Sequence, residues 1–477
     1  MSGRHPGTIL ASVRAANVII LACAASALSQ PTREPGAFLN QQRAVQQRVW
    51  DQLDQEAPAA RRVAFDYGGW YGFHMFLYDD GVESSRTLRR NDLRVWGRLT
   101  LDGGAHEIYA RGILSYLDFN TGDSFDGNDD DWEGPNLDRG YYEFNLARAM
   151  EAYAKRTLDS NLRVKIGRDL AKFGTGYALW SRLDHVLLRA DYRKFELTGL
   201  IGRTVGSDPD FDLSRPIDRT RRAFLGVQAR YLGAKGHEPF VYALWQRDHN
   251  EETSYYPGRE YDYDSFYLGI GSSGELVDNL RYSTEWVYES GHGHHERSLD
   301  PKTAIKAWAF DAELEYLFPK PMRPRASIEY MFASGDSDRT ASPTDTYAGN
   351  QPNRVDRSFN GFGYRDTGLS FAPRLSNVHV WRVGGSLFPF EKHSVFKRLE
   401  LGTSWFLYYK NRSAAAVSDP TADNPAGWLG WEMDYFANWE ITTDLAWTTR
   451  FGVFFPGDAF DDQTTRTFLL VGATYSF

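Results

Sequence analysis

Cysteine, excess basic charge and long apolar runs are all scarce in this chain of 477 residues. The only cysteine is Cys23, near the N-terminus, so no disulfide is expected in the remainder. Acidic residues outnumber basic ones and give a net charge of -9, which argues against binding to nucleic acid. After residue 30 no apolar run is long enough for a transmembrane helix, which excludes a helical membrane protein. A transmembrane β-barrel is not excluded, because its polar lumen face lowers the mean hydropathy.

Aromatic residues, by contrast, are abundant. They make up 15% of the chain, with 30 Phe, 27 Tyr and 14 Trp. This content is high for a soluble enzyme and is typical of outer-membrane barrels, which place girdles of aromatic side chains at both membrane interfaces.

The N-terminus has the layout of a secretory signal peptide. Arg4 and Arg14 precede the apolar stretch AANVIILACAASA, in which Ala25 and Ala27 form a cleavage signal. We predict that residues 1–27 are removed, which leaves a mature chain without cysteine. Two alternatives stay open: a buried first helix, and a lipoprotein signal in which Cys23 carries the lipid.

Residues 28–63 form a separate segment that is rich in Gln and Arg. Val45, Val49 and Leu53 recur every four residues beside Trp50, which predicts a short amphipathic helix. We interpret this segment as a periplasmic N-terminal lead-in to a barrel that comprises residues 64–477.

From residue 64 onward, apolar and polar residues alternate with a period of two, as in β-strands. In the segment AIKAWAFDAELEYLFP, one face carries Trp308, Phe310 and Leu314, and the other carries Asp311 and Glu313. A soluble sandwich also alternates, but its inner faces fill compact cores, and the chain shows no signal of such separate cores. The pattern favours a transmembrane barrel with apolar residues toward lipid and polar residues toward a water-filled lumen.

Eighteen such segments predict an all-β fold, a transmembrane antiparallel up-and-down β-barrel with both termini on the periplasmic side and an aqueous channel inside. The segments are 70–78, 88–102, 106–119, 141–156, 161–168, 184–193, 195–205, 223–232, 239–248, 261–271, 278–289, 304–318, 323–333, 376–388, 396–409, 428–438, 441–455 and 466–477. Tight turns alternate with long polar loops at 120–140, 207–222, 249–260, 334–375 and 410–427. The longest loop is a candidate for a constriction that folds inward.

The last residues, LLVGATYSF, have the pattern of a final strand. Gly472, Tyr475 and Phe477 fit the assembly signal by which the barrel insertion machinery recognises outer-membrane proteins. Both aromatic residues share one face, which we assign to lipid. Leu470 lies on the opposite face, where it is the one large apolar residue.

Several motifs resemble those of the alginate export family of outer-membrane porins. The most specific is TRFGVFFPGDAF at 449–460, and weaker matches are NDLRVWG at 91–97, NLAR at 145–148, KIGRDL at 165–170 and PRLSNVHV at 373–380. The similarity runs thinly over most of the chain after residue 63. It implies an eighteen-stranded channel, not an enzyme, that exports an anionic exopolysaccharide, an alginate-like polyuronate, through the outer membrane of a Gram-negative bacterium. It also implies a constriction lined by arginines, which the motifs map onto Arg94, Arg148, Arg168, Arg374 and Arg450.

Strand parity tests these five arginines independently. Arg94 and Arg450 lie on the polar faces of their segments and therefore point into the predicted lumen. Arg374 begins a stretch in which its own parity is the less aromatic one. Arg148 and Arg168 share parity with apolar residues, so either a bulge reverses the phase, or Arg168 lies in a turn, or the assignment is wrong.

Arginine suits passage of a polyuronate because a guanidinium is always charged, is weakly hydrated and pairs bidentately with carboxylates. Nearby acids such as Asp169 and Asp444 would prevent trapping, since conduction needs attraction weak enough to release the polymer. The alternative is that these arginines belong to ordinary charge ladders, paired with lumen acids.

For function, the alternatives are a porin for small solutes such as oligosaccharides or organic acids, an outer-membrane enzyme, and a structural barrel that sheathes another protein. The expected partners are the anionic polysaccharide, outer-membrane lipid, the barrel assembly machinery and a periplasmic secretion scaffold. We expect a monomer that binds no nucleic acid.

Two other clusters resemble metal sites. The sequence GHGHHE at 291–296 combines three histidines with a glutamate, as zinc sites do, but a solvated loop is favoured. The acidic stretch 123–138 places Asp126, Asn128 and Asp130 at the alternate spacing of calcium loops, but it lacks the glycine and the distal glutamate of an EF-hand. We expect no cofactor and no metal, with calcium at 123–138 as the alternative.

Overall fold

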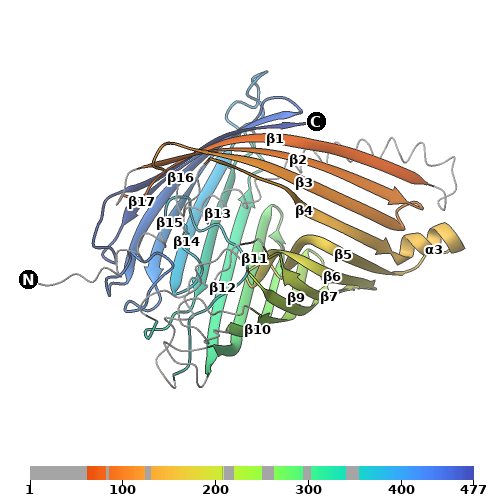
Figure 1. Cartoon of the computed structure of the whole chain (residues 1–477), viewed down its shortest axis with the longest axis horizontal. Coiled ribbons are helices and arrows are strands. Elements are labelled where there is room, and N and C mark those ends of the chain that lie inside the picture. Colours follow the sequence, from red (N-terminus) through yellow and green to blue (C-terminus); the bar gives the residue numbers. More distant parts are fainter. Residues whose placement is uncertain are drawn as a thin grey trace, which may run out of the picture.

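The chain forms a closed antiparallel barrel of eighteen strands, as the alternation predicts (Figure 1). The computed structural model describes residues 62–81, 85–123, 130–206, 208, 220–249, 263–293, 302–339 and 354–477. Each strand pairs with its neighbours in the sequence, and β18 pairs with β1 to close the sheet. The strands are β1 (Val63–Asp79), β2 (Arg86–Leu101), β3 (His106–Phe119), β4 (Asp131–Asn145), β5 (Ser160–Phe173), β6 (Leu179–Tyr192), β7 (Phe195–Thr204), β8 (Arg222–Tyr231), β9 (His237–Asp248), β10 (Tyr263–Val277), β11 (Leu280–Gly293), β12 (Thr303–Leu317), β13 (Arg325–Ala333), β14 (Val378–Leu387), β15 (Leu399–Lys410), β16 (Trp428–Glu440), β17 (Leu445–Pro456) and β18 (Arg466–Ser476).

The two faces of the wall differ as a membrane barrel requires. In β2, Leu93 and Val95 are exposed on the outer face. Asp92, on the lumen face of the same strand, is completely buried. The same alternation places Trp308 outward and Asp311 inward on β12. Apolar side chains therefore cover the outside, where lipid replaces water, and polar side chains face the interior.

No helix in the described part of the chain combines the length and the apolar character needed to cross a membrane.

The seam between β18 and β1 is closed by the C-terminal residue. Gly69 and Phe477 exchange both backbone hydrogen bonds, at 2.9 and 3.0 Å. The Phe477 ring covers Gly69 so closely that a Cβ atom there would lie 2.6 Å from the ring. Tyr475 and Phe477 stack with their centroids 6.4 Å apart, and both are exposed on the outside, as predicted.

The inward position of Leu470 is explained by an apolar cluster inside the barrel. Leu470 is 2% exposed and packs with Phe468 and Phe76 from the wall. Leu369 completes this cluster from the long connection between β13 and β14. The lumen face of β18 is therefore apolar where a loop covers it.

The predicted strand at 141–156 is wrong at both ends. Strand β4 begins ten residues earlier, at Asp131, and ends at Asn145, where helix α3 (Leu146–Ala154) begins. The Asn145 side chain accepts a hydrogen bond from the Arg148 backbone N–H at 3.2 Å and so caps the helix. Lys155 ends it in the left-handed conformation. The alanine-rich sequence LARAMEAYA favours a helix over the strand that alternation alone suggests.

The wall is interrupted between β4 and β5. Their ladder runs only from Asn145 and Arg163 to Gly140 and Arg168, whereas β5 remains paired with β6 up to Phe173. In Figure 1, β5 and β6 separate from β4 toward their ends that lie away from α3. The tip of this hairpin, 174–178, is thereby free to enter the interior.

Several predicted features lie outside the described residues. These are the signal peptide at 1–27, nearly all of the lead-in at 28–63, the central part of the acidic stretch 123–138, and the histidines after Gly293.

Candidate functional site

The candidate site is the barrel interior, which is narrowed by the connection between β13 and β14. Its described parts are 334–339 and 354–377. Ile305 of β12 forms a bridge with Asp356, and the Asn360 N–H donates to Glu289 of β11 at 2.9 Å. Further along, Phe362 and Leu179 form another bridge at the tip of the β5–β6 hairpin. The longest loop thus folds inward, and we call residues 354–377 the inner loop.

The far end of the inner loop is held by one carboxylate. Glu432 of β16 is completely buried and accepts hydrogen bonds from three successive backbone N–H groups, those of Leu369, Ser370 and Phe371, at 2.6, 2.7 and 2.9 Å. A carboxylate that accepts several N–H groups is a strong anchor, because each bond is charge-assisted. The inner loop is therefore fixed to the wall on both sides of its midpoint.

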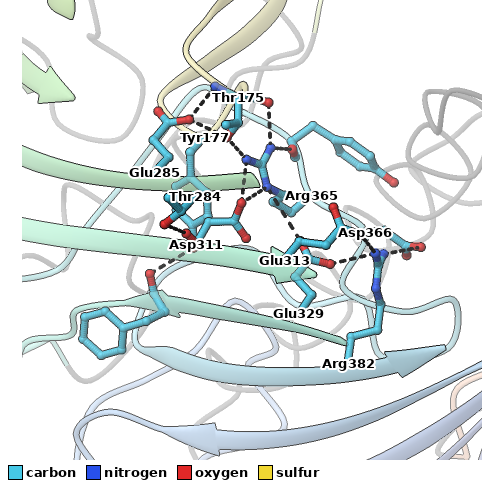
Figure 2. A network of polar contacts seen from close by, with 12 residues as sticks. Thr175, Tyr177, Thr284, Glu285, Asp311, Glu313, Glu329, Arg365, Asp366 and Arg382 are labelled. Carbon is cyan, nitrogen blue, oxygen red and sulfur yellow. Dashed lines mark hydrogen bonds and ion pairs between the residues drawn. The ribbon is translucent and has the colours of Figure 1, made fainter. Parts of the chain in front are cut away.

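The midpoint is Arg365, which lies in a dense polar network (Figure 2). Its guanidinium pairs with Asp311 of β12 at 3.0 Å, contacts Glu329 of β13 at 3.9 Å and donates to the Thr175 carbonyl at 3.1 Å. It also donates to the Thr175 hydroxyl, which itself donates to Glu285 of β11. One loop arginine thus joins the wall to the β5–β6 hairpin.

The network is rich in acid and holds Arg365 in its charged form. Burial alone would lower the pKa of Arg365, but the carboxylates of Asp311, Glu285 and Glu329 outweigh burial and raise the pKa above its usual value. Arg382 of β14 adds a second cation, which pairs with Glu329 at 2.8 Å. Both guanidinium groups are therefore paired with carboxylates of the protein itself.

An apolar core backs this network inside the barrel. Tyr177 at the hairpin tip is 1% exposed, and its hydroxyl donates to the Phe332 carbonyl of β13 at 2.9 Å. It packs against Phe359 of the inner loop, with centroids 6.0 Å apart. The hairpin tip and the inner loop therefore occupy part of the lumen, and the loop also reaches β17, where Phe371 stacks on Phe454 with centroids 4.5 Å apart.

The lumen face of β1 to β5 is polar and rich in arginine. Arg94 and Arg98 of β2 and Arg139 of β4 keep 23, 26 and 29% of their side chains exposed, although they point to the inside of a closed barrel. Each is paired: Arg98 with Asp66 at 2.6 Å, Arg94 with Asp92 at 3.3 Å, and Arg139 with Asp169 at 3.6 Å. The lumen face of these strands thus carries a charge ladder of paired arginines and acids.

Of the five arginines predicted for the pore, Arg94 and Arg450 lie on the lumen side of the wall. Arg94 also lies over the Trp70 ring, 5.7 Å from its centroid. Arg450 of β17 lies over Phe436, 5.9 Å from its centroid, and makes no ion pair within 4 Å among the described residues. The charge-ladder alternative therefore applies to Arg94, and Arg450 is the less neutralised cation.

Arg148 does not join them. Arg148 lies on α3 and not in the wall, where it is 58% exposed and pairs with Glu151 at 3.2 Å. Its assignment to a pore strand is corrected by the helix, which places it beside the short turn after β2.

Arg168 also differs from the pore prediction, whereas the pore role of Arg374 stays a prediction. Arg168 lies within β5, on the same face as the exposed Leu170, and pairs bidentately with Asp184 at 2.7 and 3.1 Å. It also donates to the Leu137 carbonyl of β4 at 3.0 Å, where the ladder between β4 and β5 ends. Arg374 lies in the inner loop before β14 begins, with its N–H donating to Ser418 at 2.9 Å.

Sequence reasoning missed the buried network. Asp311 and Glu313 were recognised as inward-facing acids, but nothing local indicated that Arg365 would meet them. The signal available was the excess of acid on the lumen faces of β11 and β12, which requires cations from elsewhere.

Neither of the two clusters that resemble metal sites lies wholly within the described residues. Within the described residues, no group of three or more His, Cys, Asp or Glu side chains is placed to hold a metal ion. Asp126 and Asn128 of the acidic stretch lie outside the described part of the chain. Asp130, which is described, instead accepts the Phe119 N–H at 2.8 Å.

Comparison with known proteins supports this picture. The family model for alginate export matches residues 186–473. This range includes Arg374 and Arg450. It does not include Arg94, Arg148 or Arg168, so the assignment of these three residues to the pore rests on short motifs alone. A search of curated proteins found no match.

Solved structures share the fold at low identity. Pseudomonas aeruginosa OccK5 (OpdH) has a TM-score of 0.55 at 10% identity, over 87% of this chain and 98% of that chain. OccK11 (OpdR) from the same organism has a TM-score of 0.52 at 12% identity, over 87% and 96% of the two chains. OccK8 (OprE) has a TM-score of 0.52 at 12% identity, over 87% and 98%. At these identities the likeness concerns the barrel architecture alone.

Proposed function

The chain belongs to the alginate export family, and from this premise we propose that it exports an anionic exopolysaccharide, an alginate-like polyuronate, by passive passage through its lumen. It is a channel of the Gram-negative outer membrane and not an enzyme. The observation that carries the proposal is the family match over more than half of the chain. A secretion system would deliver the polymer to the periplasmic end.

The geometry of the passage supports this role. The inner loop narrows the barrel, so a linear polymer would contact the wall from β1 to β5 as it passes. That wall offers guanidinium groups which are partly exposed and already paired with acids, so their attraction for a carboxylate is moderated. Conduction needs binding that is favourable enough to admit the polymer and weak enough to release it.

Single-channel recording in planar bilayers tests the proposal. We expect ion conductance that is blocked transiently by oligomers of a polyuronate and less strongly by a neutral glucan of the same length. A channel that conducts ions but shows no block by the polyuronate at any length would overturn the proposal.

A second candidate is a porin for small organic acids or oligosaccharides. It is favoured by the ion pairing of the lumen arginines, since Arg98 with Asp66 and Arg111 with Asp138 at 2.6 Å leave less attraction for a polyanion. In the same recordings, block by monomeric uronate as strong as block by the oligomers would favour this candidate.

A further inference from the structure

The passage wall presents aromatic rings as well as charges, and the proposed function does not yet use them. Trp70, Trp96, Tyr109 and Tyr141 lie on four consecutive strands, β1 to β4, and all have the lumen parity. Their outward neighbours, such as Val95 and Ile108, are the exposed ones. An aromatic girdle at the membrane interface cannot account for rings on the inner face, because they do not meet lipid.

Three of these rings form a continuous row across the wall. Tyr109 is the backbone partner of Tyr141 on the next strand, and their centroids are 5.3 Å apart with planes inclined by 23°. Trp96 and Tyr109 are 6.2 Å apart with planes inclined by 22°. These spacings are comparable to the length of one sugar unit in a polysaccharide.

A glycine makes room for Trp96, the ring at the β2 end of the row. Gly68 is the backbone partner of Trp96, and a Cβ atom at this position would lie 3.1 Å from the indole ring and 2.8 Å from the Phe477 carbonyl. The indole thus lies against the wall over a position without a side chain. A ring in this position can offer its other face to the lumen.

Cations accompany the rings along the same wall. Arg94 and Arg111 lie 5.7 and 5.2 Å from the centre of the Trp70 ring, and Lys165 lies 4.1 Å from the centre of the Tyr141 ring. Arg98 is the backbone partner of Tyr109. Two of the four rings, Trp70 and Tyr141, therefore have positive groups at the distance of a cation–π contact.

We infer that these four rings and the adjacent arginines form a binding track for uronate units inside the lumen. This inference rests on the proposed function, and it names the recognition element. A pyranose ring has an apolar C–H face that stacks on an aromatic ring and an edge that carries hydroxyl and carboxylate groups. The aromatic row would hold successive sugar faces, while Arg94, Arg98 and Arg111 pair with the carboxylates.

The arrangement also explains how such a track permits movement. The rings lie on neighbouring strands at similar spacings, so a sugar that leaves one ring meets the next at small cost. Several weak and equivalent positions conduct better than one strong position. The rings on β1 to β4 thus guide a polymer along the lumen face of these strands.

The test uses ring removal in the full channel. The double variant Trp96→Leu/Tyr109→Leu should shorten the residence time of a polyuronate block about tenfold, which corresponds to about 1.4 kcal/mol. The variant Trp96→Phe/Tyr109→Phe keeps aromatic faces and should retain most of the residence time. Trp405→Leu is the matched control, since it removes an indole from the exposed outer face of β15.

The outcomes separate this inference from the proposed function. Block of unchanged duration in the double leucine variant, with wild-type block present, would overturn the track and leave the polyuronate role intact. Absence of block in the wild-type channel would overturn the proposed function itself. Equal shortening by Trp405→Leu or by the phenylalanine variant would also overturn the track, because the effect would then not depend on lumen rings.

Discussion

The ion pairs between Arg365 of the inner loop and the barrel wall give the sharpest prediction. Substitution of Arg365 by Met removes the cation that faces Asp311 and Glu329, which are 2% and 4% exposed, and leaves them buried without this partner. Breaking a buried ion pair by removing one member costs about 3–5 kcal/mol. We therefore expect the middle of the inner loop to detach from the wall.

The barrel and the end of the loop should survive this change. Glu432 accepts three charge-assisted hydrogen bonds, from the N–H groups of Leu369, Ser370 and Phe371, each worth about 1.5–3 kcal/mol, so their sum is as large as the loss at Arg365 or larger. The strands are held by ladders on both sides and do not depend on Arg365. The predicted effect is thus local opening and not unfolding.

Single-channel conductance is the direct measurement. Arg365→Met should raise the open-channel conductance and the current noise, because the passage widens and the loop moves. Arg325→Met is the matched control, since Arg325 pairs with Glu315 and Glu400 on the wall and does not contact the inner loop. It should leave the conductance unchanged.

A charge-balanced variant sharpens the test. Arg365→Met combined with Asp311→Leu removes both members of the main pair, which usually costs far less than removing one. The double variant should return toward the wild-type conductance. If Arg365→Met alone conducts exactly like the wild type, the assigned role of this network in positioning the loop is refuted.

The remaining predictions concern the seam and the predicted pore arginines. Phe477→Ser should impair assembly into the outer membrane but not export to the periplasm, because it removes the ring that covers Gly69 at the seam; the heat-dependent electrophoretic mobility of membrane fractions measures this, and normal assembly would contradict it. Arg450→Gln should shift the reversal potential in a salt gradient toward cation selectivity, since this lumen cation has no ion pair within 4 Å among the described residues. Arg148→Ala should leave conductance and selectivity unchanged and cost at most about 1 kcal/mol, because its exposed pair with Glu151 lies on α3; a changed selectivity would restore Arg148 to the pore.

Local patterns in the sequence determined the architecture of this protein. A period of two is a property of each strand by itself, and the apolar face of each strand must meet lipid, so eighteen strands and the outward direction of Trp308, Tyr475 and Phe477 could be predicted without knowing which residues are neighbours. The same parity correctly separated Arg94 and Arg450 from Arg148 and Arg168.

Helix α3 marks where this local reasoning failed although the signal was present. The residues LARAMEAYA are good helix formers and follow an asparagine that caps them. Alternation in the preceding residues concealed the change of period, so Arg148 was placed in a strand.

The inner structure of the channel was decided only by the tertiary fold. Glu289, Asp311 and Glu432 read as ordinary lumen acids along their own strands, and Arg365 reads as one charge in a polar loop. They meet because barrel closure places strands and loops that are far apart in the sequence around one interior, where an unpaired buried charge is costly and must find its partner. The aromatic row on β2 to β4 likewise depends on strand register, which parity alone does not specify.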